Sequence, residues 1–148
     1  MGATPYELPQ HECIGLANGE TVGRLCIVDH DYPLAFPVNF KVACSDSQGV
    51  NIVVRVSPRA AIGVYEGPAS FEVDRVELDG AGAGAWSVIV RGRLRNSRGD
   101  DRLPETFPMV TEGRYQWKVL EAAAVSGRRF SSRVDSGGFS VDWQPSDN

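Results

Sequence analysis

Short apolar segments, several of them alternating with polar residues and separated by turn-forming residues, recur along most of the chain. Segments of this length and pattern predict β-strands. We expect strands at residues 21–29, 34–43, 50–56, 69–78, 86–94 and, as one strand or two, 116–130. A short helix is expected within Tyr6–Asn18, and Ser57–Tyr65 is expected to be a loop that leads into another short helix. Six or so strands without alternating helices predict a mainly β fold, an antiparallel barrel or sandwich.

The alternation also assigns side chains to the two faces of the strand at 86–94. One face carries Trp86, Val88, Val90 and Leu94, and the other carries Ser87, Ile89, Arg91 and Arg93. Pro37 interrupts the segment 34–43, and proline is tolerated in a sheet only at an edge or a bulge. Turns are expected at Asp29–Asp31 and Asp79–Gly84, and Ser97–Gly113 is expected to be a loop with room for one helical turn.

The length of 148 residues is that of one domain. We expect the domain to cover residues 1–130 and a tail rich in Ser, Gly and Asp to cover 131–148, with Phe139 and Trp143 as candidates to dock it. No apolar run reaches the ~20 residues of a membrane span, and Met1–Gln10 lacks the features of a secretory signal. Three cysteines in no tight spacing do not suggest a disulfide framework, so a cytoplasmic location without membrane partners is expected.

The charge balance argues against a general nucleic-acid binder. The chain has 15 basic and 19 acidic residues, a net charge of −4, whereas nucleic-acid binders carry a basic stripe. Only Lys41 and Lys118 are lysines, so the other thirteen basic residues are arginines. Arginine presents a planar fork that suits phosphate and carboxylate groups. Codon usage in a GC-rich genome would explain the same bias, and both explanations stay open.

Motifs that would support catalysis or metal binding are weak. Asp135–Gly138 resembles a serine-protease nucleophile segment, but neither histidine has the context of a catalytic base. His11, Glu12 and Cys13 are adjacent, so on a helix they point about 100° apart and do not converge on one ion. Glu72 and Asp74 share a strand face and are expected to be solvated. We therefore predict no catalytic side chain and no metal site.

Two arginine-containing segments remain as candidate anion sites. Within Val54–Ala61, the side chains of Arg55, Ser57 and Arg59 could reach one phosphate together with loop N–H groups. Arg91, Arg93 and Arg95 share one strand face by period two. They would form either an anion-binding ribbon or simply the solvated face of a strand.

The order and spacing of five segments is more specific than any single motif. These segments are Val22–Leu25, Pro37–Phe40, Phe71–Asp74, Trp86–Gly92 and Ser126–Phe130. In this order they resemble the pyridoxamine 5′-phosphate oxidase-like, flavin-nucleotide-binding family of actinobacteria, over about Tyr6 to Phe130. The resemblance implies a six-stranded antiparallel Greek-key split β-barrel that forms a homodimer, with two cofactor sites at the interface.

The resemblance also implies which residues bind flavin mononucleotide (FMN). The flavin ring would lie along Pro37, Val38, Asn39 and Phe40. The phosphate would be held by the strand end and loop that contain Arg55, Val56, Ser57, Arg59, Ala60, Ala61 and Ile62, and Arg128 matches a position that sometimes reaches the site. The family's loop commonly carries a hydroxyl residue and a lysine where this chain has Ala60 and Ala61. Losing two charge-assisted hydrogen bonds, each of ~1.5–3 kcal/mol, would weaken binding by about a hundredfold or more.

Three functions follow from this resemblance. The first is an FMN-binding flavoprotein, a small-molecule oxidoreductase whose partners are a second copy of the chain, the flavin and a small-molecule substrate. The second is a deazaflavin-dependent reductase on the same fold, in which Arg91, Arg93 and Arg95 would meet the anionic tail of the cofactor. The third is a barrel without cofactor that serves as a binding or scaffold protein, which Ala60 and Ala61 favour.

Overall fold

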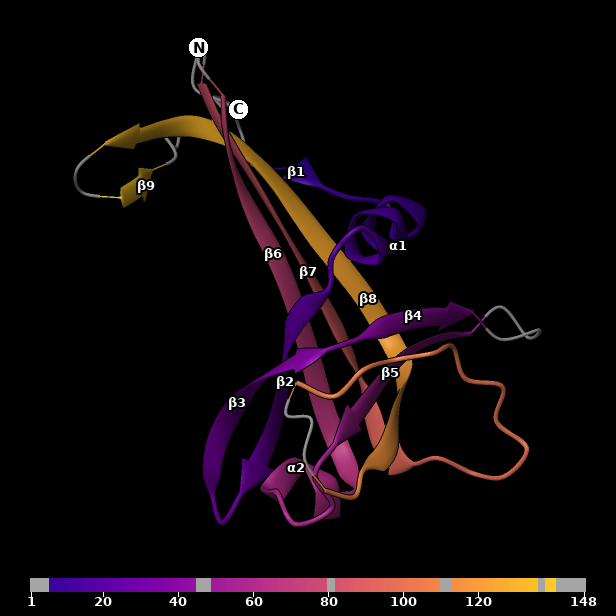
Figure 1. Cartoon of the computed structure of the whole chain (residues 1–148). Coiled ribbons are helices and arrows are strands. Elements are labelled where there is room, and N and C mark those ends of the chain that lie inside the picture. The colour runs from indigo at the N-terminus through magenta and orange to yellow at the C-terminus, as the bar shows by residue number, and fades with distance from the viewer. Residues whose placement is uncertain (1–5, 45–48, 80–81, 110–112, 136–137, 141–148) are drawn as a thin grey trace.

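The computed structural model describes residues 6–44, 49–79, 82–109, 113–135 and 138–140. These residues form two short helices and strands that are all antiparallel to their neighbours (Figure 1). In chain order the elements are β1 (Tyr6–Glu7), α1 (Gln10–Asn18), β2 (Val22–Asp29), β3 (Tyr32–Asn39), β4 (Lys41–Cys44), β5 (Val50–Val56), α2 (Ala61–Val64), β6 (Gly67–Asp79), β7 (Gly82–Asn96), β8 (Gln116–Asp135) and β9 (Gly138–Ser140). None of the helices in these ranges is long and apolar enough to cross a membrane.

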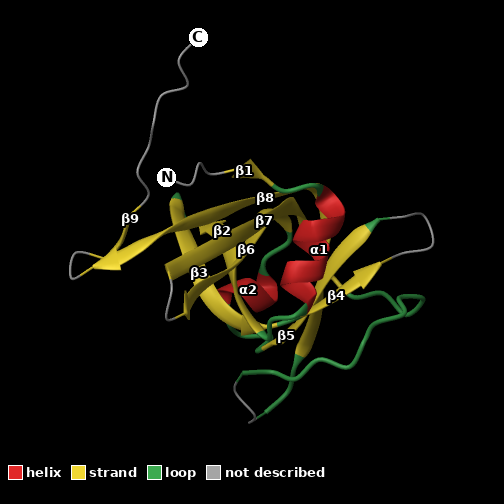
Figure 2. Cartoon of the chain, turned by 90° about the horizontal axis from the view of Figure 1, so that it is seen from above, coloured by secondary structure: helices red, strands yellow, loops and turns green. Residues whose placement is uncertain are grey.

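The strands form one curled sheet in the order β3-β2-β6-β7-β8-β5-β4, and β1 and β9 pair with β8 outside this path. The strands at the two ends of the order, β3 and β4, are separated in sequence by Phe40 alone. The chain therefore joins the two edges of the sheet, and this connection requires the sheet to bend round into a barrel. Figure 2 shows the bent sheet from above, with both helices beside it.

The predicted mainly β, antiparallel class is confirmed, but the segment 34–43 is two strands rather than one. At Phe40 the chain leaves β2 and begins to pair with β5. The N–H of Phe40 donates to the carbonyl of Thr21 at 3.1 Å, and its ring packs into the core 4.6 Å from the ring of Phe71. This break raises the number of strands along the path from the predicted six to seven.

The turn of the β2–β3 hairpin lies at Asp29–Asp31, as predicted, and the backbone conformation there is that of a defined turn type. Asp29 pairs with Tyr32, which leaves a two-residue turn in which His30 and Asp31 have φ of 47° and 70°. Positive φ at both positions is the signature of a type I′ turn, whose twist matches that of the flanking strands.

Beyond residue 130, the described part of the chain consists of β-strand. β8 continues five residues past the predicted boundary to Asp135, and β9 pairs back onto it, with Phe139 opposite Val134. Trp143, the other predicted docking residue, lies outside the described residues.

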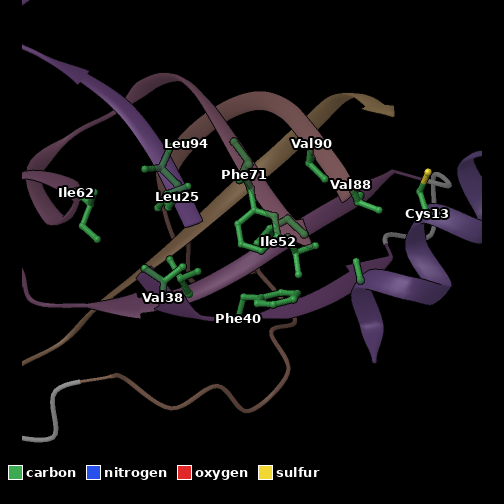
Figure 3. Close-up of a cluster of buried hydrophobic side chains, with 14 of the residues drawn as sticks. Cys13, Leu25, Val38, Phe40, Ile52, Ile62, Phe71, Val88, Val90 and Leu94 are labelled. Carbon is green, nitrogen blue, oxygen red and sulfur yellow. The ribbon is translucent and has the colours of Figure 1, made fainter. Parts of the chain in front are cut away.

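The core fills the barrel between the two helices. Cys13 of α1 lies near Val88 at one end, and Ile62 of α2 lies at the other end beside Leu25 and Leu94 (Figure 3). The predicted faces of β7 are confirmed: Trp86, Val88, Val90 and Leu94 are buried, and Ile89, Arg91 and Arg93 are exposed. All three cysteines are free thiols.

Candidate functional site

A pocket of about 250 Å³ lies where β3 and β5 end, next to α2. Its first wall is the end of β3, and its second is the end of β5 with the loop that leads into α2. Its third wall is the long connection between β7 and β8, which Figure 1 shows swinging out and passing back beside β5. The lining residues are Pro37, Val38, Arg55, Val56, Ser57, Ala60, Ile62, Pro108, Met109 and Tyr115.

Arg55 is the cation of this pocket. Register pairs it with Trp117 on β8, and its guanidinium lies 4.8 Å from the centre of the Trp117 ring and 4.9 Å from that of Tyr115. Its Nη1 donates to the carbonyl of Thr106 at 3.2 Å, whereas its buried Nε has no hydrogen-bond partner among the described residues. A buried donor without a partner costs about 1–3 kcal/mol, so this N–H would gain from an acceptor brought within hydrogen-bond distance.

The loop after β5 turns tightly back onto itself. The carbonyl of Ser57 accepts from the N–H of Ala60 at 3.2 Å, and the Ser57 hydroxyl accepts from the N–H of Arg59 at 3.3 Å. Gly63 packs so closely on this turn that a Cβ there would lie 2.0 Å from the carbonyl oxygen of Ser57. The turn and α2 therefore form one packed unit behind the pocket.

Lys118 holds this unit from inside the barrel. Its side chain is completely buried, and Nζ donates to the carbonyls of Tyr65 at 2.6 Å and Gly63 at 3.4 Å and to Oδ1 of Asn96 at 2.7 Å. Burial lowers the pKa of Lys118, and the carboxylate of Glu66 opposes this shift. Lys118 and Trp117 are adjacent on β8, so one side chain reaches α2 inside the barrel while the other flanks Arg55.

An ion pair anchors the start of the β7–β8 connection. Arg95 donates through Nη1 and Nη2 to the carboxylate of Asp101 at 2.8 and 2.9 Å, and its Nε donates to Glu121. The hydrogen bond from Arg95 lowers the pKa of Asp101 to about 2, and the Asp101 hydrogen bond raises that of Arg95. Farther along, Thr106 is buried and bonded to Arg55, so this wall of the pocket is fixed at two points.

Seven of the twelve predicted binding residues line this one pocket. They are Pro37, Val38, Arg55, Val56, Ser57, Ala60 and Ile62. Asn39 and Ala61 are half-buried beside it but are not in its lining, and the Phe40 side chain belongs to the core. The side chain of Arg59 is exposed and is not part of the lining, so the expected convergence of Arg55, Ser57 and Arg59 is reduced to two side chains.

Arg128 lies elsewhere in the chain. It is eleven residues beyond Trp117 on β8, on the order of 35 Å along the strand at about 3.3 Å per residue. There it lines a separate hollow of about 490 Å³ with Glu7 and Ser87. Within one chain, Arg128 and the pocket around Arg55 are therefore two separate sites.

The third wall of the pocket and the residues that support it were not predicted from the sequence. Pro108, Met109 and Tyr115 reach the pocket only through the path of a loop, which no periodic pattern encodes. The inward position of Lys118 could have been predicted from the sequence. Lys118 lies two residues before the apolar Leu120, on the same face of the strand, and it pairs with buried Val54. This position places an amine inside the barrel, where it must find hydrogen-bond acceptors.

Two other predicted clusters are engaged in ion pairs. Arg95 is bound to Asp101 and Glu121, so the arginine ribbon keeps only Arg91 and Arg93 as exposed cations. Glu72 and Asp74 are not merely solvated, because Arg24 on β2 donates to both. Burial raises the pKa of Glu72 while the Arg24 hydrogen bond lowers it.

The contacts among the described residues of this pocket suit the binding of a ligand. The pocket joins an apolar surface to one guanidinium and to the hydroxyl-bearing side chains of Ser57 and Tyr115, which suits an apolar ligand with an anionic end. No cluster of three or more His, Cys, Asp or Glu side chains suitable for a metal occurs among the residues that the structure describes.

Comparison with known proteins supports the same architecture. An FAD-binding protein from Mycobacterium smegmatis is 23% identical, with a TM-score of 0.66 over 86% of this chain and 99% of that one. A candidate pyridoxamine 5′-phosphate oxidase from Corynebacterium glutamicum is 23% identical, with a TM-score of 0.72 over 91% and 99%. An FAD-binding protein from Mesorhizobium loti is 21% identical, with a TM-score of 0.64 over 89% and 100%.

No curated protein sequence is significantly similar to the chain. The family model described as pyridoxamine 5′-phosphate oxidase, however, matches residues 9–131, which is most of the chain and includes every element that lines the pocket. The chain therefore belongs to the pyridoxamine 5′-phosphate oxidase family.

Proposed function

We propose that the protein binds FMN in the pocket beside Arg55 and serves as a small-molecule oxidoreductase. The observation that carries the proposal is Arg55, which lines the pocket together with Ser57 and whose buried Nε has no hydrogen-bond partner among the described residues. A phosphate oxygen would satisfy this donor. Two of the similar structures are FAD-binding proteins, which supports a flavin as the ligand class.

The pocket residues fit the two parts of such a cofactor. Arg55 and Ser57 would hold the phosphate, while Pro37, Val38 and Ile62 offer an apolar surface to the ring. The aromatic rings of Tyr115 and Trp117 keep the guanidinium in place, so little side-chain entropy would be lost on binding. A bound flavin supplies hydride and electron transfer, and the protein supplies binding and orientation.

One chain would supply only part of the site. The pocket volume of about 250 Å³ lies below the roughly 300–1,000 Å³ of ligand pockets in general. We propose that a second copy of the chain completes it, as the family resemblance implies. Arg128, which lies far from Arg55 within one chain, would then act from the partner.

Two alternatives differ in what binds the pocket. A deazaflavin with an anionic tail would need the arginine ribbon on β7, and the ion pair of Arg95 with Asp101 argues against a three-arginine ribbon. A barrel without cofactor is favoured by Ala60 and Ala61, which provide neither a hydroxyl nor a cation. Saturable binding of FMN by the wild-type protein would favour the proposed function over both alternatives.

The substitution Arg55→Gln tests the phosphate contact. A charge-assisted hydrogen bond is worth about 1.5–3 kcal/mol, so we expect FMN affinity to fall by roughly ten- to a hundredfold. Riboflavin lacks the phosphate, so its affinity should change by less than about threefold. Both affinities are measured by quenching of flavin fluorescence.

Arg91→Gln is the matched control, because Arg91 is an exposed arginine that does not line the pocket. It should leave the affinity for FMN and for riboflavin unchanged. Equal FMN affinity in wild type and Arg55→Gln would remove Arg55 from the site and overturn the proposed phosphate contact.

A further inference from the structure

The geometry points to Lys118 as a positioning residue: we propose that its buried ammonium group holds α2 in the place where the α2 turn can form the wall of the binding pocket. Lys118 does not line the pocket and would not touch the ligand. Its effect on flavin affinity rests on the proposed function, whereas its effect on α2 does not.

α2 cannot hold its own position. It is a single turn of four residues, and its N-cap residue, Ala60, offers no side-chain hydrogen bond. Isolated helices this short are unstable in water, because the cost of nucleation is not recovered in one turn. The place of α2 must therefore come from contacts with the rest of the barrel.

Three contacts fix α2, and Lys118 makes the polar one. Ile62 packs into the core, and Gly63 rests on the carbonyl of Ser57. At the C-terminal end, the ammonium of Lys118 reaches the carbonyls of Gly63 and Tyr65, which α2 itself leaves without helical partners. Lysine commonly binds the last carbonyls of a helix in this way.

The position of α2 is transmitted directly to the ligand pocket. Ala60 and Ile62, on either side of the helix start, line the pocket, and the turn at Ser57 touches Gly63. A shift of α2 would therefore move the Ser57 hydroxyl and the loop N–H groups relative to Arg55. Asn96 of β7 holds the other side of the ammonium and so fixes its direction.

The test uses Lys118→Met, which keeps an unbranched side chain of similar length but removes every donor. Hydrogen exchange of the whole protein is measured at the amides of Gly63, Val64 and Tyr65, which bond to Ala60 and Ala61. We expect these amides to exchange at least about tenfold faster than in wild type. FMN should bind about tenfold more weakly, and riboflavin, which lacks the phosphate, should lose less affinity than FMN does.

Leu120→Ala is the control for a merely structural effect. Leu120 is the next inward-facing residue of β8 and is completely buried. Its side chain has no donor for the carbonyls of α2, and it does not line the pocket. It should lower stability without selective exchange at residues 63–65 and without a change in the ratio of FMN to riboflavin affinity. Equal exchange patterns in Lys118→Met and Leu120→Ala would overturn the proposal.

Two further outcomes are decisive. If wild type binds no FMN, the proposed function fails, and the exchange at residues 63–65 still decides the role of Lys118. If Lys118→Met does not fold, Asn96→Ala removes one acceptor of the ammonium from an exposed position. Faster exchange confined to residues 63–65 in that variant supports the proposal, and unchanged exchange there overturns it.

Discussion

Gly63 lies where α2 approaches the preceding turn most closely. A Cβ at this position would meet the carbonyl oxygen of Ser57 at 2.0 Å and the Cα of Pro58 at 2.9 Å. Both are backbone atoms, so relief requires the turn itself to move. We expect Gly63→Ala to lower the free energy of unfolding by about 1–3 kcal/mol, as measured by urea denaturation. The same variant should bind FMN more weakly, because the turn carries Ser57.

Gly15→Ala is the matched control for this substitution. Gly15 lies in α1, and apart from its chain neighbours and the backbone of the helix itself no described atom lies within 4 Å of the position that a Cβ would take. Alanine is favoured over glycine in a helix by up to ~1 kcal/mol, so this variant should be slightly more stable. If Gly63→Ala were as stable as Gly15→Ala, the packed unit of α2 and its turn would not exist as described.

Single residues of the pocket were predictable where local sequence encodes them. Arg55 is the penultimate residue of an apolar strand and Ser57 follows that strand directly, so a strand-end anion site could be inferred from their order. Arg59 follows the same logic but is exposed, because the turn that closes on the Ser57 carbonyl directs the chain toward α2. The direction of a side chain after a turn depends on tertiary packing, which the local pattern does not contain.

The connection between β7 and β8 is held by the ion pair of Arg95 and Asp101, and this gives it a pH dependence. The pKa of Asp101 is lowered from 3.8 to about 2 by Arg95, so the folded state favours the carboxylate. The stabilisation is complete above about pH 4 and is lost as the pH falls toward 2. Asp101→Asn should lower the free energy of unfolding at pH 7 by about 1–2 kcal/mol.

The difference between wild type and Asp101→Asn should shrink as denaturation is measured from pH 4 to pH 2. Asp100→Asn is the control, since the side chain of this neighbouring residue is exposed. A constant difference between Asp101→Asn and wild type over this range would show that the carboxylate charge does not anchor the loop.

The elements themselves followed from the sequence more fully than the loops. Val50–Val56 was predicted with the bounds that the structure shows, because an apolar run between turn residues has one interpretation at that length. The break at Phe40 was not predicted, since an aromatic residue is equally suited to a strand interior. Its role depends on the ring of Phe71, which comes from a strand distant in sequence.

The assembly of the whole molecule gives the last prediction. The outer face of β6 and β7 carries exposed apolar side chains at Val76, Leu78 and Ile89, which a second copy would cover. Sedimentation equilibrium should give about twice the chain mass of 16.1 kDa. Leu78→Glu should shift the protein toward the monomer, because a buried charge would oppose the interface.

Tyr32→Glu is the control for the interface, because Tyr32 is 72% exposed on β3 and Leu78 is 68% exposed on β6. It should leave the mass at twice that of the chain. A wild-type protein that sediments as a monomer at tens of micromolar would contradict the proposed dimer.

The closure of the sheet into a split barrel could be predicted only from the family resemblance. Strand periodicity indicates an antiparallel sheet, but whether its edges meet depends on the one-residue link between β3 and β4. Likewise, the family resemblance implies that Arg128 and Arg55 belong to the same site, whereas within a single chain they line two separate hollows. The relation between such residues is a property of the assembled molecule rather than of any segment.

Titration of the wild-type protein with FMN, followed by quenching of flavin fluorescence, tests the proposed flavin site most directly. The predicted result is saturable binding with micromolar or tighter affinity and one FMN per chain, with riboflavin binding more weakly by at least about tenfold because Arg55 and Ser57 hold the phosphate. Absence of saturable FMN binding, or equal affinity for FMN and riboflavin, would contradict the assignment of this pocket to a flavin phosphate.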